Sequence, residues 1–310
     1  MELGLFVEPQ CGGSYDRLLE LALWAENKGL AAFARSDHYL NQDESARASD
    51  ALVSFGGLAR DTDRIRLVSL VSPITFRHPA VMAKSATTID EMSGGRFSLG
   101  VGSGWMQSEH DAFDMELPAL KERFERLEEA LEVITTIVDG GGKVNGTHYS
   151  LDAGTVLPKG SDGLGIVVGG GGMKKTPRLA GTYATEYNMF VAEKDSLDQR
   201  LDVMRGAAER AGRDPDDILI SFAGPAFVYE TENEHRQALT DRGAKREMSA
   251  DEYAAFLDAR SVPHGTADSA SRAIEQMATW GVGRYYVQEY MSLDDVDLDN
   301  LDRIFTTLQG

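Results

Sequence analysis

The chain has 310 residues, of which 42% are hydrophobic and 26% are charged, and its 50 Asp and Glu against 31 Lys and Arg give a net charge of −19. This acidity argues against binding to nucleic acid or to an anionic membrane surface, because both need clustered cations. The ordinary hydrophobic content over this length excludes a disordered chain and a small disulfide-stapled domain. Small molecules are therefore the expected partners.

The cysteine content and the start of the chain bear on location. A single cysteine, Cys11, cannot form an internal disulfide or a Cys-based metal site. The chain opens at Met1 without the basic segment and apolar run of a signal peptide, and no stretch approaches the roughly 20 apolar residues of a membrane span. We expect a cytoplasmic protein.

Short apolar runs alternate with stretches of helical period, which is typical of βα units and a parallel sheet. We expect strands over 3–8, 31–35, 65–71, 97–101, 165–168, 185–191, 218–223 and 284–288. We expect helices between Ser14 and Gly29, around 51–59, and over 79–92, 120–138, 176–182, 195–211, 267–280 and 298–308.

Two segments interrupt this alternation and are interpreted as insertions. Residues 139–164 contain an Asn145-Gly146 turn that predicts a small hairpin over 143–151. Residues 230–262 are polar and charged and predict extra helices. Eight βα units favour a (β/α)8 TIM barrel formed as one domain by residues 1–310, with a doubly wound open sheet as the alternative. In a barrel, the chemistry lies at the carboxyl ends of the strands.

Polar residues cluster where the second predicted strand ends. His38 titrates near neutral pH and can act as acid, base or hydrogen-bond donor, and Asp37 could orient its imidazole. The alternative is an Asx turn with an exposed histidine.

The fourth predicted strand ends in GVGSGW at 100–105. This is not a dinucleotide fingerprint, because Trp105 stands where the third glycine belongs. Glycines that let the backbone approach a flat ligand remain an interpretation, with Trp105 as a wall; a plain turn is the alternative. Glu109 and His110 could exchange protons, or they could be the exposed start of a helix.

The fifth predicted strand ends in a glycine run, 169–172, followed by Lys174 and Lys175 at the start of a helix. Backbone N–H groups and the helix start make this a candidate anion site, although the loop lacks the ending of a Walker motif. A flexible loop without function is the alternative.

Other strand ends carry weaker signals. His78 precedes Pro79 and is interpreted as a structural lead-in to the next helix. Tyr187-Asn188 and 288–290 could meet the edges of a ring system, or the tyrosines could be core residues. The six histidines show no metal-ligand spacing, and a Gly-x-Ser-x-Gly elbow is absent from the sequence, so neither a metal site nor a hydrolase is expected.

Taken together, the motifs resemble the bacterial-luciferase-like superfamily, and within it the branch that uses the deazaflavin coenzyme F420. They are SDH at 36–38, SPITFRHPA at 72–80, DEMSGGRF at 90–97, GVGSGW at 100–105, VGGGG at 168–172 and YYVQ at 285–288. Their order and spacing match over nearly the whole chain.

The resemblance implies a flavin or deazaflavin bound at the mouth of a barrel. Asp37 and His38 would lie beside its ring as catalytic residues, and a non-prolyl cis peptide at Ser69-Leu70 would support the other face of the ring. The cofactor-binding residues implied are Ser69, Leu70, Ser72, Gly102, Ser103, Trp105, Ser108, Gly169, Gly170, Gly171 and Gly172. Sugar-phosphate dehydrogenases of the superfamily carry Glu at the position of Trp105, which argues against sugar-phosphate oxidation.

We therefore predict an oxidoreductase in which reduced coenzyme F420 delivers a hydride to an activated C=C, C=N or C=O bond, or accepts one from an alcohol, with His38 as proton donor. An FMN-dependent monooxygenase and a non-catalytic flavin-binding relative are the alternatives. The resemblance also implies a homodimer. We expect four cations, Arg35, Arg77, Lys174 and Lys175, to face the anionic cofactor.

Overall fold

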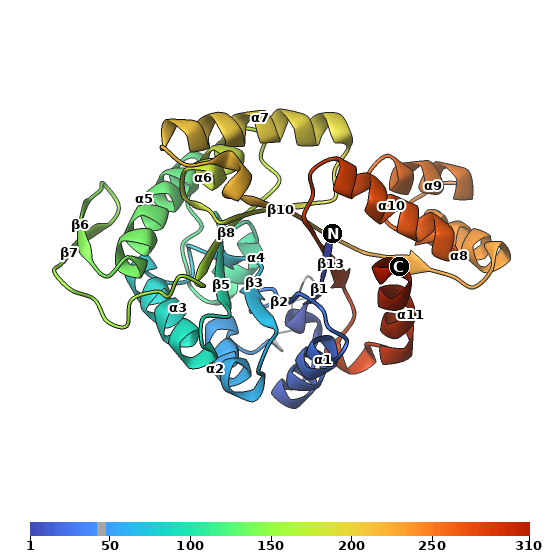
Figure 1. Ribbon diagram of the computed structural model, residues 1–310, viewed down its shortest axis with the longest axis horizontal. Coiled ribbons are helices and arrows are strands. Elements are labelled where there is room, and N and C mark those ends of the chain that lie inside the picture. The colour runs from blue at the N-terminus through green and yellow to red at the C-terminus, as the bar shows by residue number, and fades with distance from the viewer. Residues whose placement is uncertain (42–47) are drawn as a thin grey trace.

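The computed structural model describes residues 1–41 and 48–310. In this part of the chain, eight parallel strands close into a barrel (Figure 1). They are β1 (Glu2–Val7), β2 (Ala32–Arg35), β3 (Arg66–Ser69), β5 (Phe97–Gly102), β8 (Gly165–Gly169), β9 (Glu186–Phe190), β10 (Leu219–Gly224) and β13 (Arg284–Glu289). Each strand pairs with the next in this order, and β13 pairs with β1. The predicted (β/α)8 barrel is confirmed, and the open sheet is excluded by the pairing of β3 with β5 and of β13 with β1.

Helices surround the barrel, as the alternation predicts (Figure 1). They are α1 (Tyr15–Asn27), α2 (Ala51–Asp61), α3 (Pro79–Ser93), α5 (Leu120–Val138), α6 (Lys175–Tyr183), α7 (Lys194–Arg210), α10 (Ala267–Thr279) and α11 (Leu298–Gln309). None of the helices in the described residues is both long and apolar enough to cross a membrane.

Local capping chemistry sets several of these helix ends. Ser14 accepts a hydrogen bond from the Arg17 backbone N–H at the start of α1. α3 ends at Ser93, and the capping residue Gly94 takes the left-handed conformation with φ 70°. The His78 side chain accepts from the Ala80 backbone N–H and caps α3, so its predicted role as a structural lead-in is confirmed.

The two predicted insertions have the expected secondary structure. β6 (Gly142–Asn145) and β7 (Ser150–Ala153) form an antiparallel hairpin beside α5. α8 (Glu232–Ala244) and α9 (Ala250–Asp258) pack on each other around a separate apolar cluster. Figure 1 shows the hairpin and the helix pair on opposite sides of the barrel.

The predicted strand 65–71 is shorter in the structure. β3 ends at Ser69, and after a break the short strand β4 (Ser72–Pro73) pairs with β5. The non-prolyl cis peptide lies between Leu70 and Val71, in this break. Its expected position at Ser69-Leu70 was wrong by one bond.

The interior of the barrel is separate from the main apolar core, which lies between strands and helices. Successive side chains of a strand point to opposite faces, so alternate residues point inward. Phe6, Ala34 and Val167 fill the interior together with Tyr286, whose ring occupies the space beside Gly4.

A buried ionic network lies inside the barrel. Arg284 donates to Glu186 at 2.7 Å and to Glu2 at 2.6 Å, and Glu186 also accepts from Ser221 and Tyr286. Arg284 and Glu186 are both buried. The Arg284 guanidinium and the Glu186 carboxylate therefore stabilise each other, because a buried charge without a partner is strongly unfavourable.

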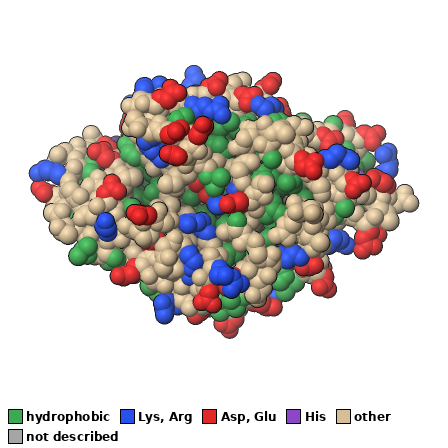
Figure 2. All heavy atoms as spheres, in the orientation of Figure 1, with side chains coloured by type: hydrophobic (Ala, Val, Ile, Leu, Met, Phe, Trp, Pro, Cys, Tyr) green, Lys and Arg blue, Asp and Glu red, His purple; other side chains and the backbone are tan. Residues whose placement is uncertain are grey.

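The outer surface carries both kinds of charged side chain that the composition contains. On the face shown in Figure 2, Lys and Arg side chains are interspersed among Asp and Glu and do not gather into one basic patch.

We expect Arg284→Met to lower the free energy of unfolding by about 3–5 kcal/mol, because it leaves Glu186 buried without its cation. Arg303→Met is the control, since the Arg303–Glu230 pair is exposed; we expect a loss below about 1 kcal/mol. Urea unfolding measures both. Equal losses for the two variants would contradict this assignment.

Candidate functional site

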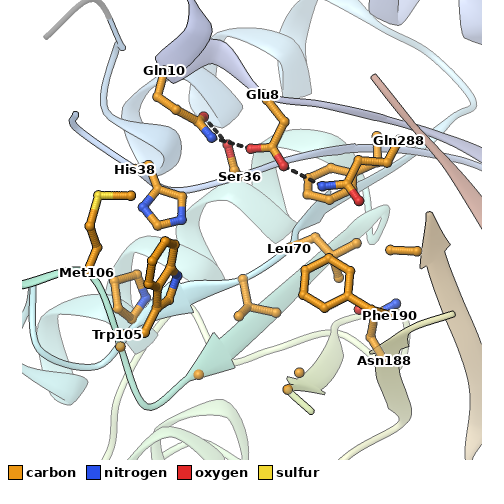
Figure 3. A pocket seen from close by; sticks show the side chains of 18 of the residues that line it. Glu8, Gln10, Ser36, His38, Leu70, Trp105, Met106, Asn188, Phe190 and Gln288 are labelled. Carbon is orange, nitrogen blue, oxygen red and sulfur yellow. Dashed lines mark hydrogen bonds between the residues drawn. The ribbon is translucent and has the colours of Figure 1, made fainter. Parts of the chain in front are cut away.

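A cavity of about 690 Å³ opens at the carboxyl ends of the barrel strands. This volume suits a small-molecule or cofactor site. Figure 3 shows three sides: His38 with Trp105 and Met106, a polar group around Glu8, and Leu70 with Phe190 and Asn188. The predicted location at the strand ends agrees with the position of the cavity.

The structure brings most of the predicted site residues to this cavity. Those that line it are His38, Leu70, Gly102, Ser103, Trp105, Gly169, Gly170 and Gly171. Those that do not are Asp37, Ser69, Ser72, Ser108 and Gly172.

His38 is held by a carboxylate from a distant part of the chain. Its Nδ1 lies 3.0 Å from Oε2 of Glu109, on the short helix α4 (Gln107–Ala112). Glu109 is buried and also accepts from the backbone N–H groups of Tyr39 and Leu40. The Trp105 ring meets the imidazole edge to face at 5.7 Å. The alternative of an exposed histidine in a turn is therefore wrong.

These contacts shift the pKa of both groups. Burial lowers the pKa of His38, but the hydrogen bond and charge of Glu109 outweigh it, so the pKa lies above its ordinary value. Burial raises the pKa of Glu109, but His38 and the two backbone donors lower it below its ordinary value. A histidine that exchanges protons near neutral pH is thus paired with an ionised carboxylate.

His110 is buried and has both ring nitrogens engaged. Its Nδ1 lies 2.7 Å from the Met106 carbonyl oxygen, and its Nε2 lies 2.8 Å from Thr75 Oγ1. The carbonyl can only accept, so Nδ1 carries a proton, and in the neutral imidazole Nε2 accepts from Thr75. The alternative of an exposed helix start is wrong for both Glu109 and His110.

Asp37 points away from the cavity and is bound by Arg77. The two Arg77–Asp37 contacts are 2.6 and 3.2 Å, and Arg77 also reaches Asp50. Arg35 is fully buried against α2, where it donates to Ser54 at 2.6 Å. The expectation that Arg35 and Arg77 face the cofactor is wrong, because protein groups bind both and neither lines the cavity.

The two predicted lysines lie outside the cavity lining as well. The Lys175 ammonium instead lies over the Phe124 ring, 5.1 Å from its centroid.

The floor of the cavity depends on Val71 and on the glycines around it. A Cβ at Gly100, Gly102 or Gly169 would come within 2.9, 2.8 or 2.6 Å of a Val71 methyl group. These glycines therefore make room for Val71, and Val71 and Leu70 present an apolar surface to the cavity. Ser69 ties β3 to β5 by accepting from the Gly100 N–H at 2.8 Å.

The glycine run lies beside a cation that the sequence did not single out. Arg200, on α7, donates to the Gly171 carbonyl at 3.1 Å, and its Nε contacts the Met173 sulfur at 3.2 Å. No carboxylate pairs with Arg200 within the described residues. A basic residue in the polar face of an amphipathic helix has no sequence signal for this role.

A hydrogen-bonded polar wall, which we define as Glu8, Gln10, Ser36, Gln288 and Tyr290, forms another side of the cavity. Figure 3 labels the first four of these residues. Gln10 and Gln288 both donate to the Glu8 carboxylate, the latter at 2.5 Å. Ser36 donates to Gln10, and Tyr290 donates to Gln288. Glu8 and Gln10 were missed, although their position just after the first strand is a signal for a barrel mouth.

Asn188 lines the cavity and donates to Ser221 at 2.9 Å, whereas Tyr187 packs in the core outside the barrel. The described residues contain no group of three or more His, Cys, Asp or Glu side chains placed to hold a metal ion.

A family model described as luciferase-like monooxygenase matches residues 1–291. The chain belongs to the luciferase-like monooxygenase family. The predicted superfamily is thereby confirmed.

Two curated proteins are similar to part of the chain. A protein of Microbacterium testaceum named F420-dependent glucose-6-phosphate dehydrogenase is 32% identical over 208 residues, which cover 66% of this chain and 61% of that protein. A protein of the same name from Nakamurella multipartita is 32% identical over 206 residues, covering 65% and 60%. The matched part thus spans about three fifths of these relatives.

Solved structures share the fold of this chain. An F420-dependent secondary alcohol dehydrogenase in complex with an F420-acetone adduct has a TM-score of 0.79 at 20% identity, covering 100% of this chain and 99% of that chain. The oxygenating constituent of the FMN-bound diketocamphane monooxygenase of Pseudomonas putida has a TM-score of 0.77 at 17% identity, covering 99% and 96%. At these identities, the likeness concerns the fold.

We expect Gly169→Ala to cost about 1–3 kcal/mol of unfolding free energy, because the new Cβ would press on Val71. Gly171→Ala is the matched control: a Cβ there meets nothing within 4 Å, and we expect a change within about 0.5 kcal/mol. Chemical denaturation compares them. A Gly169→Ala variant as stable as Gly171→Ala would refute the role of Val71.

Proposed function

We propose that the protein is an F420-dependent oxidoreductase that transfers a hydride between the deazaflavin and a small organic substrate. When the reduced cofactor donates the hydride, the substrate that accepts it would carry an activated C=C, C=N or C=O bond. In the opposite direction, an alcohol would donate the hydride to the oxidised cofactor. The observation that carries this proposal is the His38–Glu109 pair on the wall of a cavity with an apolar floor. The names of the curated relatives support the choice of coenzyme.

The residues present fit such a cofactor. The apolar surface of Leu70 and Val71 suits the face of a flat ring, and Asn188 and the polar wall suit polar ring edges. The open space at Gly171 and the guanidinium of Arg200 beside it suit the phosphate of the tail.

When bound, the deazaflavin accepts or delivers the hydride. The chain supplies proton transfer and orientation. Because Glu109 engages Nδ1 of His38, Nε2 is the nitrogen left to exchange a proton with the substrate. As an alcohol loses a hydride from carbon, neutral His38 takes the hydroxyl proton; in the reverse direction, protonated His38 returns it to the oxygen.

An FMN-dependent monooxygenase is the second candidate, favoured by the family description and by FMN-bound structures of the same fold. A non-catalytic flavin-binding relative would bind cofactor without turnover. A cytoplasmic location stays a prediction from the sequence, and a homodimer stays a prediction from the resemblance.

Titration of the purified protein with F420 and with FMN tests the cofactor, and we expect saturable F420 binding with weaker FMN binding. Arg200→Gln should weaken F420 binding about tenfold, because a charge-assisted contact to the tail is lost. Arg205→Gln, exposed on the same helix, should leave binding unchanged. Saturable binding of FMN alone would favour the monooxygenase instead.

We expect Glu109→Gln to lower the pKa of His38, because the charge that raises it is removed while the burial that lowers it remains. Histidine NMR titration measures this without a substrate. In the F420-loaded protein, His38→Ala should cut turnover about a hundredfold or more.

The control for these variants is His148→Ala, which alters a histidine outside the cavity lining. It should change neither the His38 titration nor turnover. An unmoved His38 pKa in Glu109→Gln would contradict the coupling, and unchanged turnover in His38→Ala would contradict the proton-transfer role.

A further inference from the structure

The charged side chains that line the cavity are negative, whereas a site for a phosphorylated sugar needs cations to bind the phosphate. Among the described residues, the lining includes two carboxylates, Glu8 and Glu109, and neither a lysine nor an arginine. Arg200 lies outside the lining, beside the glycine run. Glu109 is committed to His38, so Glu8 is the carboxylate still available to a substrate.

Glu8 is presented by a wall that uses most of its own donors. The Gln10 and Gln288 amides donate to the two oxygens of Glu8, and the Ser36 and Tyr290 hydroxyls donate to the two amide oxygens. Each carboxylate oxygen can accept a second hydrogen bond. The strongest group of the wall that can still form a hydrogen bond is therefore the Glu8 carboxylate. It is a negatively charged acceptor that is mostly shielded from water.

Figure 3 shows this wall on the side of the cavity away from Leu70 and Phe190, with His38 at one end. A flat ring against the apolar side leaves the substrate between the ring and the polar wall. A substrate whose reacting hydroxyl meets His38 then brings its neighbouring substituent toward Glu8.

We propose, on the basis of the function proposed above, that the substrate is a small alcohol, or its carbonyl counterpart, that bears a second hydrogen-bond donor, a hydroxyl or an amino group, and no negative charge. Glu8 accepts from this donor and determines specificity. Phosphate esters are rejected, because a dianion in this cavity meets carboxylates without a compensating cation. The substrate class thus differs from that in the names of the curated relatives.

The test compares compounds of similar size with the wild-type protein: propylene glycol and isopropanolamine against glycerol phosphate, with glucose 6-phosphate as a further anion. Binding is measured by the fluorescence of bound F420 and by calorimetry on the cofactor-free protein. We expect the diol and the amino alcohol to bind at least about tenfold more tightly than either phosphate ester. Reduction of bound F420 should follow the same order.

Glu8→Gln removes the charge while nearly keeping the shape of the side chain. In this variant, the affinities for the uncharged or amino compounds and for the phosphate esters should differ by no more than about threefold. Glu20→Gln, which removes an exposed carboxylate outside the cavity, should leave the preference unchanged. Thermal unfolding checks that both variants fold, and the wild-type comparison stands even if Glu8→Gln does not.

Two results would overturn the substrate proposal: binding of either phosphate ester as tight as that of the uncharged compounds, or no saturable binding of the diol and the amino alcohol. Failure of the protein to bind F420 is a separate result, because calorimetry on the cofactor-free protein still reports the charge preference. Failure to bind F420 would contradict the proposed function, and calorimetry would then decide the substrate preference by itself.

Discussion

The contact between His38 and Glu109 connects the parts of the structure on which the site depends. It joins the loop after β2 to α4, two segments 71 residues apart, and it shifts the pKa of both groups. Glu109 also binds two backbone amides of the His38 loop, so the carboxylate fixes both the position and the protonation of the imidazole. Without it, the burial that lowers the pKa of His38 would be opposed only by the more weakly acting charges of Glu8 and Asp37.

The alternation of side chains along each barrel strand decides which predicted residues reach the cavity. Asn188 points inward and lines it, whereas its neighbour Tyr187 packs against the helices. Arg35 follows inward-facing Ala34 and is buried against α2. The barrel, the secondary structure of its insertions and the position of the cavity could be predicted, because periodicity and strand ends are visible in sequence. The direction in which side chains point just beyond the strand ends could not be predicted, because a loop need not continue the alternation of the strand. Asp37 is an example: it follows β2 but binds Arg77 and does not line the cavity.

Long-range contacts explain the rest of what sequence reasoning could not find. The glycines of β5 and β8 look like ligand-binding glycines in the sequence, but in the folded chain they first accommodate Val71, which comes from a third segment. Arg200 reaches the glycine run from α7, and Glu8 faces the cavity from the residue that follows β1. Each of these roles depends on residues far apart in the chain, which no local pattern encodes.

The net charge of −19 and the charges of the cavity have to be considered separately. Acidic side chains on the outer helices are solvated and say little about ligands. Inside the cavity, screening is weaker, so the same sign of charge on Glu8 acts on a bound substrate directly. The cation that suits an anionic cofactor tail, Arg200, lies beside the glycine run, apart from the polar wall. On the function and substrate class proposed above, this separation would let one mouth hold an anionic cofactor and reject an anionic substrate.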